Sequence, residues 1–153
     1  MKRYLFLDVD GVCNHADWYN KNGYGAGDYD PHVIELLNQL ADIDVQVVIS
    51  SSWSTMADKP LRDLGLKLPI VGHIEQFSSY CTWMCRGNEI AKWLELNVIQ
   101  EHIDDRYEYV IFDDTKEFLM EQEENLVWID PKHGVTQENI DKARKILTWG
   151  TLD

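Results

Sequence analysis

Two carboxylates, Asp8 and Asp10, end an apolar run that begins at Tyr4, and Gly11 follows them directly. Side chains two residues apart on a strand share a face, so both acids start out on one side of the chain. Like charges held this close favour a divalent cation, and Gly11 lets the backbone bend closely around such an ion and a bound phosphate. The pattern is typical of phosphoryl transfer. The alternative is a strand that ends in an ordinary polar turn.

Other candidate residues follow later apolar runs. Ser50 comes after one such run, and the pair Asp113 and Asp114 comes after another. Ligands of an open parallel sheet lie at the carboxyl ends of its strands, so we expect these groups to meet Asp8 there. Arg86, at the start of an expected helix, could anchor a phosphate, although a loop arginine could equally pair with one of the 27 acidic residues.

The elements that must position these residues alternate along the chain, and this alternation predicts an α/β fold. We expect a three-layer, Rossmann-like, five-stranded parallel sheet with helices on both faces. The strands are predicted at 4–9, 45–49, 68–74, 107–112 and 126–129, and the helices from Pro31 (capped by Asp30) to near Ala41, before Gly65, from Arg86, and after the cap Thr136. No repeat or linker divides the chain, so residues 1–153 are predicted to form a single domain.

Charge and composition limit the function further. The formal net charge of −13 disfavours broad, non-specific nucleic-acid binding, but it leaves a nucleotide end open as a substrate. No apolar run reaches the roughly 18 residues that a membrane span needs, and the amino terminus does not resemble a signal peptide. We therefore expect a cytoplasmic protein of bacterial or phage origin, without a membrane partner. Its oligomeric state stays open.

The cysteines indicate no disulfide framework. There are three, Cys13, Cys81 and Cys85, at spacings that fit a reducing compartment. Cys81 and Cys85 could bind zinc with His73 or His102, but the spacing is poor for such a site. The simpler interpretation is that they are small, half-buried side chains.

The order of these motifs resembles the haloacid dehalogenase (HAD) superfamily of phosphotransferases, over nearly the whole chain. Five segments are similar, more closely, to the HAD domains associated with RNA-repair proteins, which are related to the phosphatase halves of polynucleotide kinase-phosphatases. They are FLDVDGV at 6–12, VISSSW at 48–53, RGNEI at 86–90 with Trp93 and Leu94, IFDD at 111–114 and GVT at 134–136. The chain departs from the pattern at Ser54, where an arginine is common. The basic residue of the third motif is either Arg86 or Lys92, and helical spacing turns Lys92 toward solvent.

The resemblance implies a reaction and a role for each residue. Asp8 would attack phosphorus and form an aspartyl-phosphate, while Asp10 would protonate the leaving oxygen and later activate water. An acid at position 10 favours phosphate chemistry over carbon–halogen cleavage. Ser50 would bind a phosphoryl oxygen, and Arg86 would stabilise the charge of the transition state.

The resemblance also implies a Mg²⁺ cofactor. Its expected ligands are Asp8, the backbone carbonyl of Asp10, and the Asp113–Asp114 pair. Because adjacent strand residues face opposite ways, we expect one member of that pair to bind the ion directly and the other to act from behind it.

The intervals between motifs are too short for a full cap domain, so the active site is expected to be open to a phosphorylated polymer end, a nucleotide or a phosphoprotein. Residues 13–29 include four aromatic side chains, Trp18, Tyr19, Tyr24 and Tyr29. They could stack on a base or simply cover the end of the sheet. Trp53, beside Ser50, is expected to be a packing residue.

Two functional alternatives compete with a phosphatase. A receiver-type signalling domain would need adjacent acids after its first strand, whereas this chain has Asp8 and Asp10 there and adjacent acids only after its fourth. The order of motifs therefore disfavours a receiver. A catalytically silent module that keeps the fold and binds metal or phosphate stays open, although intact Asp8 and Asp10 do not favour it.

Overall fold

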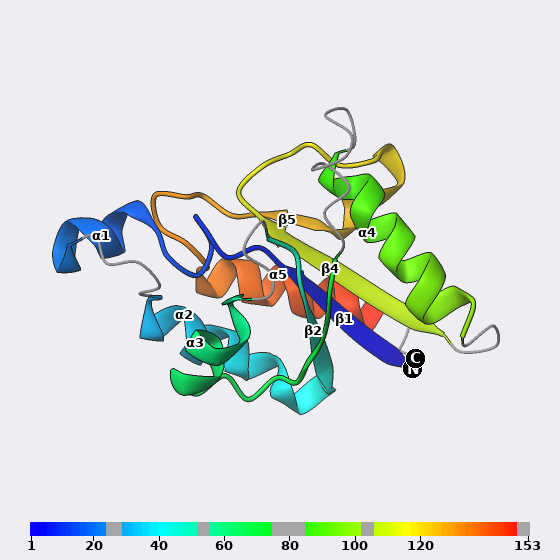
Figure 1. Cartoon of the computed structure of the whole chain (residues 1–153), viewed down its shortest axis with the longest axis horizontal. Helices are drawn as coiled ribbons and strands as arrows, with labels where there is room; N and C mark the ends of the chain where they lie inside the picture. Colours follow the sequence, from blue (N-terminus) through cyan, green and yellow to red (C-terminus); the bar gives the residue numbers. More distant parts are fainter. Residues whose placement is uncertain (24–28, 52–55, 75–84, 102–105, 150–153) are drawn as a thin grey trace.

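The computed structural model describes residues 1–23, 29–51, 56–74, 85–101 and 106–149 (Figure 1). Five strands form one all-parallel sheet in the order β3-β2-β1-β4-β5. The elements are β1 (Lys2–Leu7), α1 (Ala16–Asn22), α2 (Pro31–Asn38), η1 (Gln39–Ile43), β2 (Val45–Ile49), α3 (Asp58–Asp63), β3 (Ile70–His73), α4 (Arg86–Leu94), η4 (Glu95–Ile99), β4 (Tyr107–Asp113), η5 (Met120–Asn125), β5 (Leu126–Trp128) and α5 (Gln137–Thr148). The predicted α/β fold with a five-stranded parallel sheet is confirmed.

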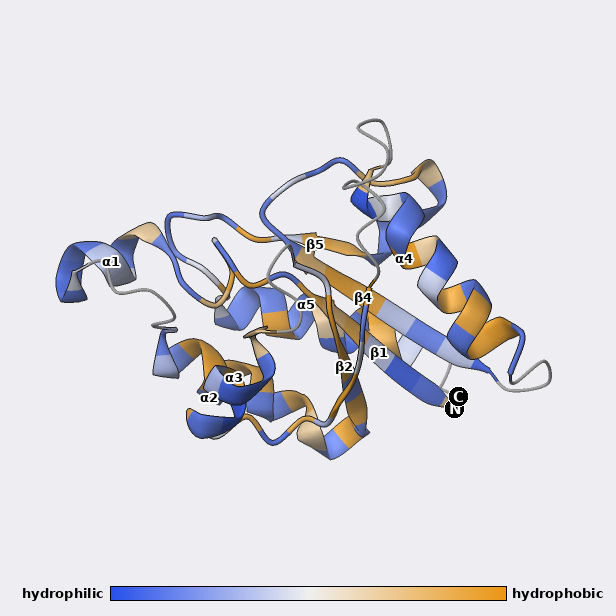
Figure 2. Ribbon diagram, viewed as in Figure 1, coloured by the Kyte–Doolittle hydropathy of each residue, from blue (hydrophilic) through white to orange (hydrophobic). Residues whose placement is uncertain are grey.

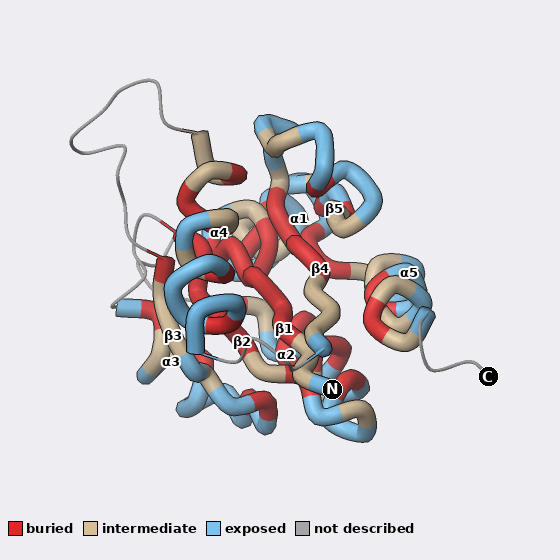
Figure 3. The backbone as a smooth tube through the Cα atoms, turned by 90° about the vertical axis from the view of Figure 1, so that its right-hand side faces the viewer, coloured by how far each residue is buried: buried red, intermediate tan, exposed pale blue. Residues whose placement is uncertain are grey.

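Helices cover both faces of the sheet, and the strands alternate between two cores. Leu5 and Leu7 of β1 pack on one face with apolar side chains of α2, α3 and α5. Tyr4 and Phe6 point to the other face, where they join α4 and η4. Apolar residues concentrate along the strands and on the inner sides of these helices, and the buried parts of β1 and β4 run through the centre of the molecule (Figures 2 and 3).

The predicted helix caps are present. Asp30 Oδ1 accepts a hydrogen bond of 2.9 Å from His32 N at the start of α2, and Thr136 forms a reciprocal capping box with Asn139 at the start of α5. The helix after Pro31 ends earlier than expected, at Asn38, and the chain continues as a 3₁₀-helix, η1. No helix among the described residues is long and apolar enough to cross a bilayer.

Helix α1 was not predicted, since the segment that forms it has no apolar stripe and buries none of its residues. Its first turn is capped by His15, whose Nδ1 accepts from Trp18 N at 3.3 Å. In Figure 1, α1 projects from the body of the protein at the left of the view. Its position depends on tertiary contacts, such as the hydrogen bonds from Ala16 N to Pro131 O (3.0 Å) and from Asp17 N to Lys132 O (2.9 Å), which local sequence patterns do not reveal.

Candidate active site

The parallel register brings three predicted site residues together at the carboxyl edge of the sheet. Leu7 pairs with Ile49 of β2 and with Phe112 of β4. The next residue of each strand is therefore Asp8, Ser50 or Asp113. Backbone hydrogen bonds continue at this level, from Asp8 N to Phe112 O (3.0 Å) and from Ser50 N to Leu7 O (2.8 Å). The predicted convergence of the first, second and fourth strand ends is confirmed.

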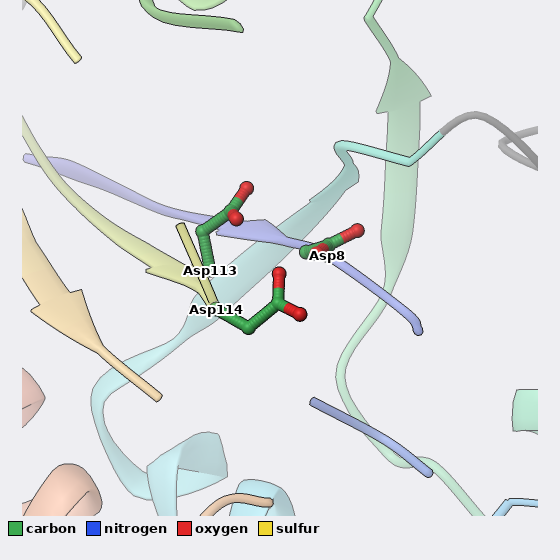
Figure 4. A group of neighbouring side chains, drawn as sticks. All are labelled: Asp8, Asp113 and Asp114. Atoms are coloured by element: carbon green, nitrogen blue, oxygen red, sulfur yellow. The ribbon is translucent and has the colours of Figure 1, made fainter. Parts of the chain in front are cut away.

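Three carboxylates form an acidic group at this edge (Figure 4). Asp8, Asp113 and Asp114 each offer an oxygen, and these oxygens lie within 4.8 Å of one another. The expectation that Asp113 and Asp114 face opposite ways is wrong, because β4 ends at Asp113 and Asp114 lies in the following turn, where strand alternation no longer applies.

Burial and mutual repulsion disfavour the charged form of these acids. Burial, and then the charge of Asp113, raise the pKa of Asp8 to about 8, against the opposing effects of a 2.9 Å hydrogen bond from Val9 N and of Arg86. Burial also raises the pKa of Asp113 to about 6, although hydrogen bonds from Thr115 N and Oγ1 oppose this shift. A cation bound beside these carboxylates would favour their charged form.

The donor set suits a hard divalent cation. Three carboxylate oxygens are the ligand type that Mg²⁺ and Ca²⁺ prefer, while sulfur and imidazole ligands are absent from this group. Gly11 lies directly beside the acidic group. The φ angle of Gly11 is +81°, and a Cβ atom at this position would collide with the Asp114 carboxylate. The backbone angle favours glycine at this turn, and a larger residue would also displace the Asp114 carboxylate.

Asp10 lies apart from the acidic group. It is exposed, and its Oδ1 accepts a hydrogen bond of 3.0 Å from Asn14 Nδ2. Asn14 Oδ1 in turn accepts from Gly11 N at 2.8 Å. Sequence reasoning missed Asn14; the only available signal was an amide side chain three residues after the DxDG glycine. The expected contribution of the Asp10 backbone carbonyl to a metal site stays a prediction.

Two buried hydrogen-bond donors at this edge lack partners among the described residues. They are the Ser50 hydroxyl and Nη1 of Arg86, the first residue of α4. The positive charge of Arg86 lowers the pKa of both Asp8 and Asp113, so the guanidinium lies within electrostatic reach of the acidic group. Since unpaired buried donors are costly, both groups are suited to an anionic ligand.

The two candidates for the third-motif base, Arg86 and Lys92, differ in their surroundings. Its side chain is 48% exposed and lies 3.7 Å from Glu95 on the solvent side of α4. The helix buries Ile90 and Leu94 instead, as the sequence pattern predicts. Of these two candidates, Arg86 is the one whose charge acts on Asp8 and Asp113.

Several sequence predictions lie outside the described residues. They concern Tyr24, Trp53, Ser54, and the zinc candidates Cys81 and His102. Two zinc candidates remain: Cys85 is a free, half-buried cysteine, and His73 contacts Asp58, with Nε2 and Oδ1 2.6 Å apart. Of the described aromatic residues in the segment 13–29, Trp18 and Tyr19 lie on α1, and Tyr29 is buried.

Comparison with protein families supports the relation suggested by the motifs. The model of the HAD domain in Swiss Army Knife RNA repair proteins matches residues 4–140, from the third residue of β1 into α5. Comparison with curated proteins and with solved structures gives no significant match. The family match spans every strand and the whole acidic group. The chain therefore belongs to the family of HAD domains found in Swiss Army Knife RNA repair proteins.

Proposed function

We propose that this protein is a Mg²⁺-dependent phosphomonoester hydrolase that works through an aspartyl-phosphate on Asp8. The observation that supports it most is that groups suited to a cation and groups suited to an anion lie at one edge of the sheet. An acidic group there is suited to a cation, and the buried donors of Ser50 and Arg86 beside it are suited to an anion. A phosphate bound through a divalent cation answers both needs.

The proposed reaction has two steps. In the first, a carboxylate oxygen of Asp8 attacks phosphorus, the bond to the ester oxygen breaks, and Asp10 donates a proton to the leaving alkoxide. In the second, Asp10 takes a proton from water as that water attacks phosphorus, which releases inorganic phosphate and restores Asp8. The hydrogen bond from Val9 N fixes the orientation of the Asp8 carboxylate for the attack.

The remaining groups bind and stabilise charge. The Ser50 hydroxyl would donate to one phosphoryl oxygen, and Arg86 would stabilise the negative charge that spreads over the oxygens in the transition state. Asp8, Asp113, Asp114 and the Asp10 carbonyl would hold Mg²⁺. When bound, Mg²⁺ would neutralise the carboxylates and polarise the phosphoryl group.

A nucleotide or a polynucleotide 3′ end is our proposed substrate. The family takes its name from RNA repair proteins, and the short intervals between motifs favour a site without a full cap. The net charge of −13 argues that such a substrate is recognised at its phosphorylated end and not along its backbone.

A phosphate-release panel tests the proposal. The panel contains 3′-phosphorylated oligonucleotides, 5′-nucleotides, sugar phosphates, phosphopeptides and an aryl phosphate, each with Mg²⁺ or with a chelator. We expect Mg²⁺-dependent release, fastest from the 3′-phosphorylated oligonucleotides. Activity on none of them would favour the catalytically silent module, and preference for another class would overturn the proposed substrate alone.

Asp8→Asn tests the covalent mechanism. We expect it to abolish turnover and to leave the fold intact, because the amide is nearly the same size but is a poor nucleophile. Asp10→Asn should lower the rate by a factor on the order of 10² or more. The matched control is Asp141→Asn, on the exposed side of α5. An Asp8→Asn protein with the wild-type rate on the aryl phosphate would exclude the mechanism.

A further inference from the structure

Asp10 has one described side-chain partner, and that partner is buried. Asn14 is only 4% exposed, and it links the Asp10 carboxylate (3.0 Å) to the Gly11 backbone N–H (2.8 Å). The orientation of the amide follows from these bonds. Gly11 N–H can only donate, so it requires the amide oxygen, and the amide NH₂ is left for the carboxylate.

The loop that carries Asn14 is anchored on both sides. Cys13 is buried, its N–H donates to Val9 O (2.8 Å), and its carbonyl accepts from Asp30 N (2.9 Å). His15 is buried too, and its Nε2 lies 2.7 Å from Asp30 Oδ2. With both neighbours fixed, the Asn14 side chain has little freedom, so it can hold a more mobile group in place.

Asp10 needs such a restraint because its own position is exposed and close in sequence to the acidic group. A free Asp10 carboxylate could turn toward a cation held by Asp8, Asp113 and Asp114, and it would then be lost as a proton donor. The hydrogen bond from Asn14 favours the arrangement in which the Asp10 carboxylate stays outside that group, as the structure shows.

We propose that Asn14 is a positioning residue that holds the Asp10 carboxylate in place for proton transfer and away from the cation site. This inference rests on the proposed function. Asn14 acts only through Asp10, so its loss should matter most where the leaving group needs a proton. Alkyl phosphates release a basic alkoxide and need that proton, whereas 2,4-dinitrophenyl phosphate releases a stable anion without it.

Two variants separate the hydrogen bonds of Asn14. Asn14→Ala removes both, whereas Asn14→Asp keeps an oxygen for Gly11 N–H and places a second carboxylate against Asp10. The full chain with Mg²⁺ is assayed with a nucleoside 3′-phosphate and with 2,4-dinitrophenyl phosphate. The value compared is kcat/KM, which reports the attack by Asp8. Asn97→Ala is the control, since this exposed asparagine donates to the Trp93 carbonyl far from Asp10 in sequence.

We expect both variants to lower kcat/KM for the alkyl ester about tenfold or more and to change it less than about threefold for the dinitrophenyl ester. Because Asn14→Ala frees Asp10 to turn toward the cation, this variant should not bind Mg²⁺ more weakly than the wild type. Equal losses on the two esters would show that Asn14 supports the site in general, and no loss would show that Asp10 needs no restraint. Either result overturns the inference. If Asn14→Ala does not fold, Asn14→Asp decides the matter by the same comparison.

An NMR measurement keeps the inference separate from the proposed function. In the wild-type protein the side-chain amide of Asn14 should exchange slowly, and Asp10→Ala should shift its resonances and speed its exchange at least severalfold. Unchanged Asn14 signals in Asp10→Ala would overturn the contact, whatever the activity. A wild-type protein that hydrolyses neither ester would overturn both the proposed function and the catalytic role of Asn14, even with the contact intact.

Discussion

At the scale of single residues, the site depends on carboxylates whose charged form is disfavoured by burial and by neighbouring negative charge. Asp8 and Asp113 are buried side by side at adjacent strand ends. Burial raises both pKa values, and the charges of Asp113 and Asp114 raise that of Asp8 further, while the charge of Asp114 raises that of Asp113. A structural role alone gives no reason to keep both acids there, since their repulsion destabilises the folded chain. Perturbed carboxylates of this kind are common at functional sites.

Asp113→Asn tests whether the buried charge of Asp113 destabilises the protein. The variant keeps Oδ1 as an acceptor for Thr115 N and Oγ1, but it removes one buried charge beside Asp8. We expect the Mg²⁺-free variant to be more stable than the wild type at pH 8, by on the order of 1–2 kcal/mol, and to lose the stabilisation by Mg²⁺. Urea unfolding with and without Mg²⁺ measures both effects. A less stable variant that still responds to Mg²⁺ would contradict the prediction.

At the scale of elements, the turn after β1 is shaped by contacts with the end of β4. Gly11 adopts a φ of +81° and packs so closely against Asp114 that no side chain fits between them. Gly65, in the turn after α3, has a similar φ of +95°, but nothing lies within 4 Å of the place where its Cβ would be. A comparison of the two glycines therefore distinguishes the effect of backbone strain from the effect of crowding by Asp114.

Substituting each glycine by alanine tests that difference. Both variants should lose about 1–2 kcal/mol of stability, because an L-residue is strained at positive φ. Only Gly11→Ala should also weaken Mg²⁺ binding, by tenfold or more, since its methyl group displaces Asp114. Calorimetric titration with Mg²⁺ and thermal unfolding of both variants provide the comparison. Equal Mg²⁺ affinities would show that the approach of Gly11 to Asp114 is not needed for the ion.

At the scale of the whole molecule, stability and cation binding are linked through pH. The folded chain binds protons at Asp8 and Asp113 more tightly than the unfolded chain does, because both pKa values lie above the usual 3.8. The contribution of these two groups to stability is thus fully present below about pH 4. It is lost as the pH rises through their folded pKa values of about 6 and about 8.

Mg²⁺ should reverse this loss, since it binds the ionised carboxylates and releases their protons. We expect the rise in Tm caused by Mg²⁺ to be larger at pH 8 than at pH 6. Differential scanning calorimetry at both pH values, with the ionic strength matched by a monovalent salt, measures the difference. A rise that is equal at the two pH values, or larger at pH 6, would contradict the raised pKa values.

Local patterns in the sequence determined the strands, the main helix caps and the strand ends at which the site lies. Apolar runs that follow the period of a buried strand, and caps such as Asp30 and Thr136, encode their structure within a few residues. That information placed Asp8, Ser50 and Asp113 on one edge, because parallel strands align their carboxyl ends.

Only the tertiary structure decided how side chains beyond the strand ends are directed. Asp114 joins the acidic group, Asn14 donates a hydrogen bond to Asp10, and the charge of Arg86, at the start of α4, acts on the acids. Once a strand ends, the direction of a side chain depends on turn angles, such as that of Gly11, and on contacts with segments far away in the chain. Strand alternation carries no information on either, and the tertiary contacts of the folded chain set both.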